Sequence, residues 1–306
     1  MFRAFSLAAV IAAFALAVLG SWIRINGAGM TCPDWPLCHG AVVPALDGAV
    51  VLEWSHRMLA LLVGALLLGA IVSGWRARHQ IAGITPILLA LGAIFGLQVA
   101  LGAATVAVAN SPWSVVLHWG TGMLFLGALT ALAIVAVVQP RPGKRPAQSG
   151  LYPLLALTLA GAFIAMCAGA YVSSSGAGLA CSSLPGCEPG AWRGGGTPAE
   201  TAQMLHRTLA GIFFVVATIV AYWSSLATTP RVRAAALGAY ALIVLQVMLG
   251  MANVVWQLPL GLREAHAANA AATFIVFVAA MVFAAIDGTV REAAPGRVPS
   301  RAARAR

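Results

Sequence analysis

Eight long apolar runs constrain this sequence more than any other feature. Each run has the length that an α-helix needs to cross the hydrocarbon core of a bilayer, and only 8% of the 306 residues are charged. We therefore predict an all-α membrane protein with eight transmembrane helices, at about 5–25, 53–74, 83–105, 113–138, 152–172, 203–226, 236–254 and 262–286. The first run could also be a removable signal peptide, but a matching run near residue 152 favours a permanent helix.

The basic residues predict the orientation in the membrane. Of the 18 Lys and Arg residues, 13 lie in the N-terminus, in alternate connectors and in the C-terminal tail, whereas 5 lie on the other side. Cytoplasmic loops are the basic ones, so we expect both termini in the cytoplasm of a multi-pass bacterial inner-membrane protein. The net charge of +10 then reflects topology, and no nucleic-acid partner is expected.

The two halves of the chain repeat each other with a shift of about 149 residues. The matched pairs are Gly27-Ala28-Gly29 with Gly176-Ala177-Gly178, His56-Arg57 with His206-Arg207, Gln98 with Gln246, and His118 with His266. We predict two tandem four-helix bundles, 1–138 and 152–286, related by a pseudo-twofold axis along the membrane normal. A Pro-rich cytoplasmic linker, 139–151, joins them, and a basic tail, 287–306, follows.

Four of the five cysteines form two pairs with five residues between partners. Cys32 and Cys38 lie in one long outer loop, at about 26–52, and Cys181 and Cys187 in the other, at about 173–202. Both loops face the oxidising side in the predicted topology, so the pairs are expected to be disulfides. A dithiol that exchanges electrons is the alternative for the first loop. Cys167 is expected to be a small buried apolar residue.

Four of the six histidines recur in pairs inside the predicted helices, near their outer ends. They are His56, His118, His206 and His266. Ionisable groups in a bilayer are costly and usually functional, and two facing imidazoles can ligate one haem iron. An interhelical hydrogen bond is the alternative for each histidine, and zinc would need further ligands. Arg57 and Arg207 could contact haem propionates, or could simply extend to the interface.

One exchange between the halves has chemical consequences. Glu53, three residues before His56, is replaced by Gln203, three residues before His206. At this spacing the carboxylate and the histidine share one side of a helix. A reacting site near Glu53 and a redox site without a carboxylate would explain the difference. A carboxylate stabilised by the helix dipole is the alternative.

These residues together resemble the haem A synthase family, whose members oxidise haem O to haem A for terminal oxidases. The resemblance spans about residues 5–286. It rests on Gly27-Ala28-Gly29-Met30-Thr31-Cys32-Pro33-Asp34-Trp35-Pro36-Leu37-Cys38-His39-Gly40, on Glu53-x-x-His56-Arg57, and on His118, His206-Arg207 and His266.

The resemblance implies how the two halves divide the work. A haem B cofactor is expected in the second half with His206 and His266 as axial ligands, and haem O is expected between His56 and His118. Glu53 matches the essential carboxylate of the family. The implied reaction oxidises a porphyrin methyl group through an alcohol to a formyl group.

The resemblance also implies a Cys32–Cys38 disulfide, whereas Cys181 and Cys187 are not general in the family. The enzyme that makes haem O and an electron acceptor are the expected protein partners, and a homo-oligomer is left open. The alternative function is a di-haem b-type electron-transfer protein, which the four histidines alone fit equally well. A haem transporter would need exposed ligation. A prenyltransferase would need Asp-rich clusters for magnesium diphosphate, which this sequence lacks.

Overall fold

The structure is a computed structural model that describes residues 1–140, 151–190, 192, 194, 196–227 and 229–287. Eight α-helices and one 3₁₀ turn make up its regular structure, and all eight helices are long and apolar enough to cross a membrane. This confirms the predicted fold class. The elements are α1 (Phe2–Ile25), α2 (Val50–Arg76), α3 (Ile84–Ala107), α4 (Pro112–Val138), α5 (Tyr152–Ser174), η1 (Ala177–Leu179), α6 (Pro198–Ala227), α7 (Pro230–Val255) and α8 (Leu260–Asp287).

The helices extend beyond the apolar runs that predicted them, most of all at the start of α6 and α7. Before α6, the amide of Thr197 donates to the Glu200 carboxylate and the amide of Glu200 donates to the Thr197 hydroxyl, both at 3.2 Å. This reciprocal pair is a capping box. α7 begins with Pro230, a residue whose fixed backbone angle suits the first helical position. Hydropathy locates only the apolar part of a helix, whereas capping groups decide where it starts.

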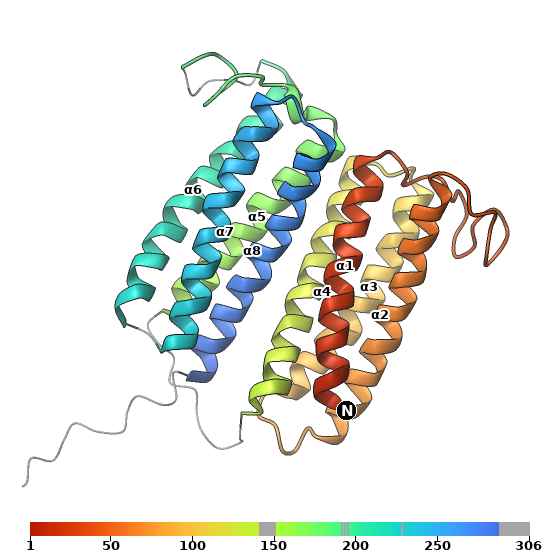
Figure 1. The fold of residues 1–306 in the computed structure, drawn as a ribbon, viewed down its shortest axis with the longest axis vertical. Coiled ribbons are helices and arrows are strands. Elements are labelled where there is room, and N and C mark those ends of the chain that lie inside the picture. Colours follow the sequence, from red (N-terminus) through yellow and green to blue (C-terminus); the bar gives the residue numbers. More distant parts are fainter. Residues whose placement is uncertain (141–150, 191, 193, 195, 228, 288–306) are drawn as a thin grey trace, which may run out of the picture.

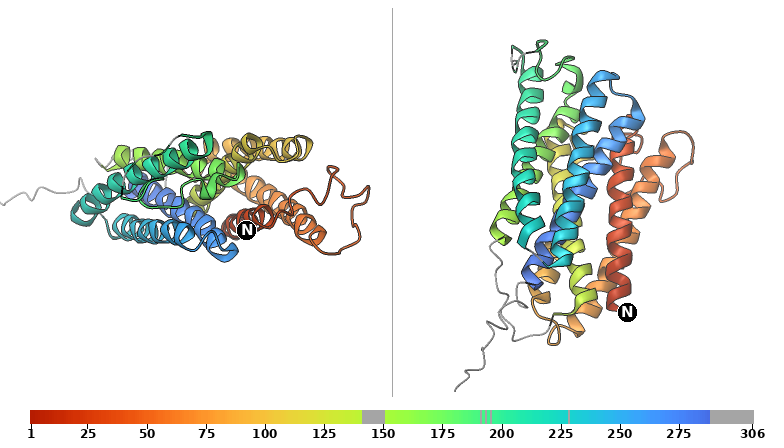
Figure 2. Two further views of the ribbon diagram at one scale, coloured as in Figure 1. Left: turned by 90° about the horizontal axis from the view of Figure 1, so that it is seen from above. Right: turned by 60° about the vertical axis from the view of Figure 1, so that its left-hand side comes forward.

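The helices form two groups that stand side by side (Figure 1, Figure 2). α1 packs closely against α2 and α3 against α4 in one half, as α5 does against α6 and α7 against α8 in the other. Across the interface between the halves, α4 meets α5 and α8, and α1 meets α8. This arrangement is consistent with the predicted tandem bundles.

The interface between the halves combines apolar packing with a few polar groups, among them Ser21 and Arg24 of α1 and Glu264 of α8. A Cβ added at Gly127 on α4, in the first half, would lie 3.1 Å from the ring of Phe274 on α8, in the second half. The small residue therefore lets α4 approach α8 closely, as is common where helices associate in membranes.

Both cysteine-bearing loops lie at one end of the molecule, and the N-terminus lies at the other (Figure 1). The predicted linker, apart from residues 139, 140 and 151, and the tail after Asp287 fall outside the described residues. The four recurring histidines also lie near the loop end, so the candidate site is at that end of the molecule.

Candidate functional site

The four recurring histidines occupy matching places in the fold. His56, His118 and His266 each lie six residues after the first residue of their helix, and His206 lies eight residues after. They belong to α2, α4, α8 and α6, all of which start at the loop end (Figure 1). At about 1.5 Å per residue, the four side chains lie at similar depth, two in each half.

Each histidine ring rests on a glycine of the helix that precedes its own. A Cβ added at Gly20, Gly102, Gly169 or Gly250 would lie 2.9, 3.1, 2.8 and 3.3 Å from the Cε1 atom of His56, His118, His206 and His266, respectively. A side chain at any of these positions would push the ring away. The glycines therefore fix where the four imidazoles can sit, and both halves use the same device.

One of the four histidine rings makes the second contact that is typical of a metal-ligating histidine. Nδ1 of His206 lies 3.0 Å from the carbonyl oxygen of Ala165, the contact by which ligating histidines commonly orient the ring and leave Nε2 for the metal. Nδ1 of His56, His118 and His266 is buried and has no hydrogen-bond partner among the described residues. Leaving polar atoms unpaired in an apolar interior costs free energy, so these rings are poorly explained as structural hydrogen-bonding groups.

The donor set fits haem better than a bare metal ion. Within the part of the chain that the structure describes, no group of three or more His, Cys, Asp or Glu residues could hold a metal ion. Protein zinc sites need at least three such ligands. Haem iron takes four of its ligands from the porphyrin and needs only two imidazoles, which each half provides.

Two equivalent glutamines behave differently near the histidines. In the first half, Nε2 of Gln98 lies 3.5 Å from Nε2 of His118. In the second half, Gln246 donates to the backbone carbonyl of His266 at 3.0 Å and accepts from Asn269 at 2.7 Å. Gln246 is therefore held by backbone and amide partners, whereas Gln98 contacts the imidazole itself.

Glu53 anchors the first loop and is almost completely buried, with 6% of its surface exposed. One carboxylate oxygen accepts from the Cys32 amide at 2.8 Å and from the Thr31 hydroxyl at 3.0 Å. The other accepts from the Arg57 guanidinium at 2.7 Å. A buried carboxylate is tolerated when its charge is paired and hydrogen-bonded in this way.

Gln203 occupies the equivalent place in the second half, with 4% of its surface exposed. Its side-chain oxygen accepts from the Cys181 amide at 2.5 Å, and its nitrogen donates to the Gly178 carbonyl at 2.8 Å. The amide and the carboxylate thus hold the same backbone group of their loops. Holding the loop does not require a negative charge.

Arg57 and Arg207 bind their loops through several carbonyl groups. Arg57 donates to the carbonyl oxygens of Asp34, Leu37 and Cys32 at 2.5–2.9 Å. Arg207 donates to those of Ser183, Pro185, Gly186 and Cys181 at 2.7–3.2 Å. These contacts go beyond the interfacial extension considered from sequence. The contact with haem propionates stays a prediction.

Disulfides close a short ring in each loop, Cys32–Cys38 and Cys181–Cys187, and Cys167 is free. In the first ring, Asp34 accepts from the amides of His39 and Gly40, each at 2.7 Å. The Gly40 amide, followed by that of His39, holds the pKa of the Asp34 carboxyl below its usual value. The first loop is therefore braced by a fixed charge as well as by the disulfide.

Comparison with known proteins decides the family. The family of cytochrome oxidase assembly proteins matches residues 3–51 and 47–278, which is most of the chain.

The chain belongs to this family.

Three relatives named haem A synthase illustrate the similarity to other cytochrome oxidase assembly proteins. That of Bacillus pumilus is 30% identical over 283 residues, which cover 86% of this chain and 89% of the relative. That of Symbiobacterium thermophilum is 32% identical, with 81% and 84% covered. That of Shewanella oneidensis is 28% identical, with 85% and 90% covered. The similarity extends across both halves and both candidate sites.

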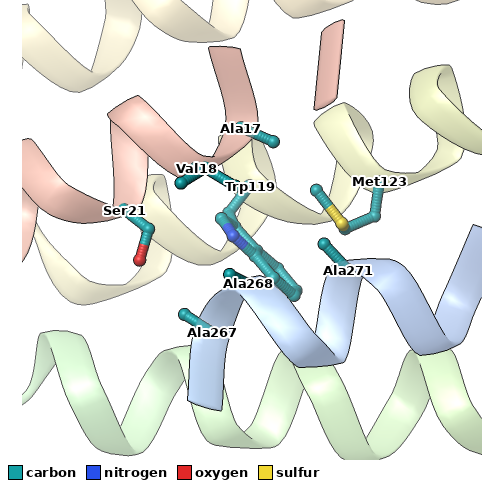
Figure 3. Close-up of a pocket in the computed structure, with 8 residues that line it drawn as sticks. All are labelled: Ala17, Val18, Ser21, Trp119, Met123, Ala267, Ala268 and Ala271. Atoms are coloured by element: carbon teal, nitrogen blue, oxygen red, sulfur yellow. The ribbon is translucent and has the colours of Figure 1, made fainter. Parts of the chain in front are cut away.

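A small pocket of this cytochrome oxidase assembly protein lies between the halves and not at the histidines (Figure 3). Its lining residues are Ala17, Val18, Ser21, Trp119, Met123, Ala267, Ala268 and Ala271. Trp119 follows His118 in the chain and Ala267 follows His266, so the pocket lies beside both candidate sites. Its lining contains no histidine, so it does not itself hold the candidate ligands.

Some residues of the site received no role from the sequence. The glycines under the histidine rings and the two glutamines recur in both halves, and that recurrence was the signal that could have assigned them. Asn269 has Thr121 at the matching position, so no repeat marked it. Cys167 is half-buried, and a Cβ added at Gly120 of α4 would lie 3.3 Å from its sulfur.

Proposed function

We propose that this protein is a membrane-bound haem A synthase, which oxidises a methyl group of haem O to a formyl group. Membership of the cytochrome oxidase assembly protein family and the names of the relatives support the reaction. The observation that carries the proposal is the exchange of Glu53 for Gln203 between two otherwise equivalent sites. One half has a carboxylate next to its histidine pair, and the other has kept the hydrogen bonds but not the charge.

The first half, 1–138, is proposed to bind the substrate haem O between His56 and His118. The second half, 152–286, is proposed to hold haem B between His206 and His266. The seating of all four rings on glycine supports this assignment, and so does the His206–Ala165 contact, which suits a permanently ligated ring. Haem B, when bound, supplies one-electron redox chemistry.

The reaction needs a group that handles protons near the substrate. Conversion of the methyl group to an alcohol takes up the oxygen of water and releases an electron pair and two protons. Conversion of the alcohol to the formyl group releases a second electron pair and two more protons, and both electron pairs are proposed to pass to an external electron acceptor. A positioned carboxylate can accept such protons or stabilise positive charge that develops at the reacting carbon. Glu53 is proposed for this role.

The second half provides an internal control for that role. Gln203 holds the amide of Cys181 just as Glu53 holds that of Cys32. If anchoring the loop were the only task, an amide would serve in both halves. The charge of Glu53, paired with Arg57, is what the first half adds.

The protein is further proposed to lie in the bacterial inner membrane with both termini in the cytoplasm. The distribution of basic residues supports this orientation, as do the two disulfides at the loop end. Reporter fusions at the C-terminus and in the first loop would test it. Activity of a cytoplasmic reporter in the loop would contradict the orientation.

The deciding experiment for the function is chromatography of haems extracted from the purified protein after co-expression with a haem O-producing enzyme. We expect haem B together with haem O, its alcohol or haem A. His56→Ala should lose the substrate haem and keep haem B, whereas His206→Ala should lose haem B. Haem B alone, at two per chain, would instead support the di-haem electron-transfer protein.

A further inference from the structure

The contact between the second and third helix, here called the seam, differs between the two halves. In the second half, the rings of Phe214 on α6 and Tyr240 on α7 stack with centroids 6.1 Å apart. The hydroxyl groups of Thr218 on α6 and Tyr240 form a hydrogen bond of 3.2 Å. Two aromatic rings and one polar contact therefore join α6 to α7 on the membrane side.

The first half lacks all three of these side chains. The alignment of the two halves used above pairs His56 with His206 and Gln98 with Gln246. In the same alignment Gly64 corresponds to Phe214, Leu68 to Thr218, and Gly92 to Tyr240. A Cβ added at Gly92, or at Gly96 one turn further, would meet nothing within 4 Å. α2 also touches α3 far less than α6 touches α7, and the two helices diverge when seen from above (Figure 2).

One ring crosses the open seam. Phe95 of α3 lies against Gly64 of α2, where an added Cβ would lie 2.9 Å from the end of the ring. The Phe95 ring also lies 5.6 Å from that of Phe125 on α4. A single aromatic side chain therefore crosses the seam of the first half, whereas a stacked and hydrogen-bonded pair crosses that of the second half.

The open seam lies directly below the candidate substrate site. Gly64 follows His56 by eight residues, which places it about 12 Å further into the membrane. The centre of the bundle at that depth is filled, because Val63, Leu67 and Leu126 are at most 2% exposed. A long apolar chain attached to a haem between His56 and His118 therefore finds no room down the bundle core. The seam gives it a way out toward lipid.

We propose that the isoprenoid tail of the substrate haem lies in the seam between α2 and α3. Gly92 and Gly96, beside which the seam is open, make the first half specific for a haem that carries such a tail, while Phe214, Thr218 and Tyr240 exclude the tail from the second half. This inference rests on the proposed function, because the proposed substrate, haem O, differs from haem B in carrying a long isoprenoid tail. His56 and His118, which are proposed to hold the macrocycle, lie above the seam.

The test transfers one residue of the closed seam to the open one. Gly92→Tyr, purified in lipid nanodiscs, is titrated with haem O and separately with haem B, which has no tail. We expect the dissociation constant for haem O to rise about tenfold or more, because several methylene groups lose their burial site. Affinity for haem B and the content of cofactor haem should stay as in the unsubstituted protein.

Leu97→Tyr is the matched control. Leu97 lies on the same helix, is 52% exposed and is turned about 140° away from Gly92. It should bind haem O normally. Unchanged haem O affinity in Gly92→Tyr, or equal loss of haem O and haem B, would overturn the inference. If Gly92→Tyr does not assemble, Gly96→Val is tested by the same criteria. This substitution introduces the residue type found at the equivalent position of the second half, Val244.

The same preparations separate this inference from the proposed function. An unsubstituted protein that converts haem O to haem A establishes the function, whatever Gly92→Tyr does. If the unsubstituted protein binds no haem O and forms no haem A, both proposals fail together. If it converts haem O and Gly92→Tyr does so with the same affinity, only the inference about the seam fails.

Discussion

The two halves of this protein share a scaffold and differ in a few side chains. In both halves, two histidine rings pack against glycines. A buried residue three positions before a histidine binds the disulfide-closed loop in each half, and an arginine binds the same loop. The halves differ at two pairs of equivalent positions. Glu53 of the first half corresponds to Gln203 of the second, and Gly92 corresponds to Tyr240. The comparison teaches that ligand geometry can be duplicated with the backbone, whereas reactivity and substrate choice are set by single side chains.

The largest expected effect tests whether charge separates the halves. Glu53→Gln should keep the loop anchored, as Gln203 does, and should keep both haems, but turnover should fall about 10²–10⁴-fold, the range for loss of a general acid or base. Single-turnover conversion of haem O measures this. Gln203→Glu is the matched control and should not add activity. Normal turnover by Glu53→Gln would remove the chemical distinction between the halves.

Substitution of the glycines that contact the histidine rings should disable one half at a time. Gly169→Val should displace His206 and lower the content of haem B, because even an added Cβ would lie 2.8 Å from the ring. Gly20→Val should do the same to His56 and substrate haem, and should leave haem B in place. Absorption spectra with haem quantification check both. Equal loss of haem B in the two variants would show that the halves do not bind haem independently.

The equivalent glutamines should differ in what they stabilise. Gln246→Leu leaves the buried Asn269 without one of its partners, and a buried group left unpaired costs about 1–3 kcal/mol. We expect thermal unfolding in detergent to shift down for this variant. Gln98→Leu removes only a 3.5 Å contact to His118 and should shift unfolding less. A larger shift for Gln98→Leu would reverse the order we infer.

The smallest expected effect concerns the two loops and acid. Because backbone amides lower the pKa of Asp34, its contribution to loop stability is complete above the unfolded value of about 3.9 and is lost only as pH falls through the lower folded value. Susceptibility of the first loop to proteolysis should therefore not change between pH 7 and pH 5. The second loop has Ser183 at this position and serves as the comparison. Below a pH of about 4 the first loop should become more susceptible to proteolysis, and Asp34→Asn should remove this acid-dependent change.

The order of residues was enough to predict the eight membrane spans, the repeat, the histidine pairs and the cysteine pairs. Hydropathy and spacing are properties of the chain order, so eight apolar runs and a shift of about 149 residues could be identified without coordinates. The exchange of Glu53 for Gln203 was visible for the same reason. Helix ends were less accurate, because capping contacts such as that of Thr197 with Glu200 decide them.

Contacts between side chains of different helices became visible only in the folded protein. Arg57 was considered for haem propionates, yet its guanidinium group holds loop carbonyls and Glu53. The seat of His56 on Gly20 and the stacking of Phe214 on Tyr240 join different helices. Such contacts depend on the rotation and depth of each helix relative to its neighbour. Packing of whole surfaces fixes these quantities, and no local pattern of residues encodes them.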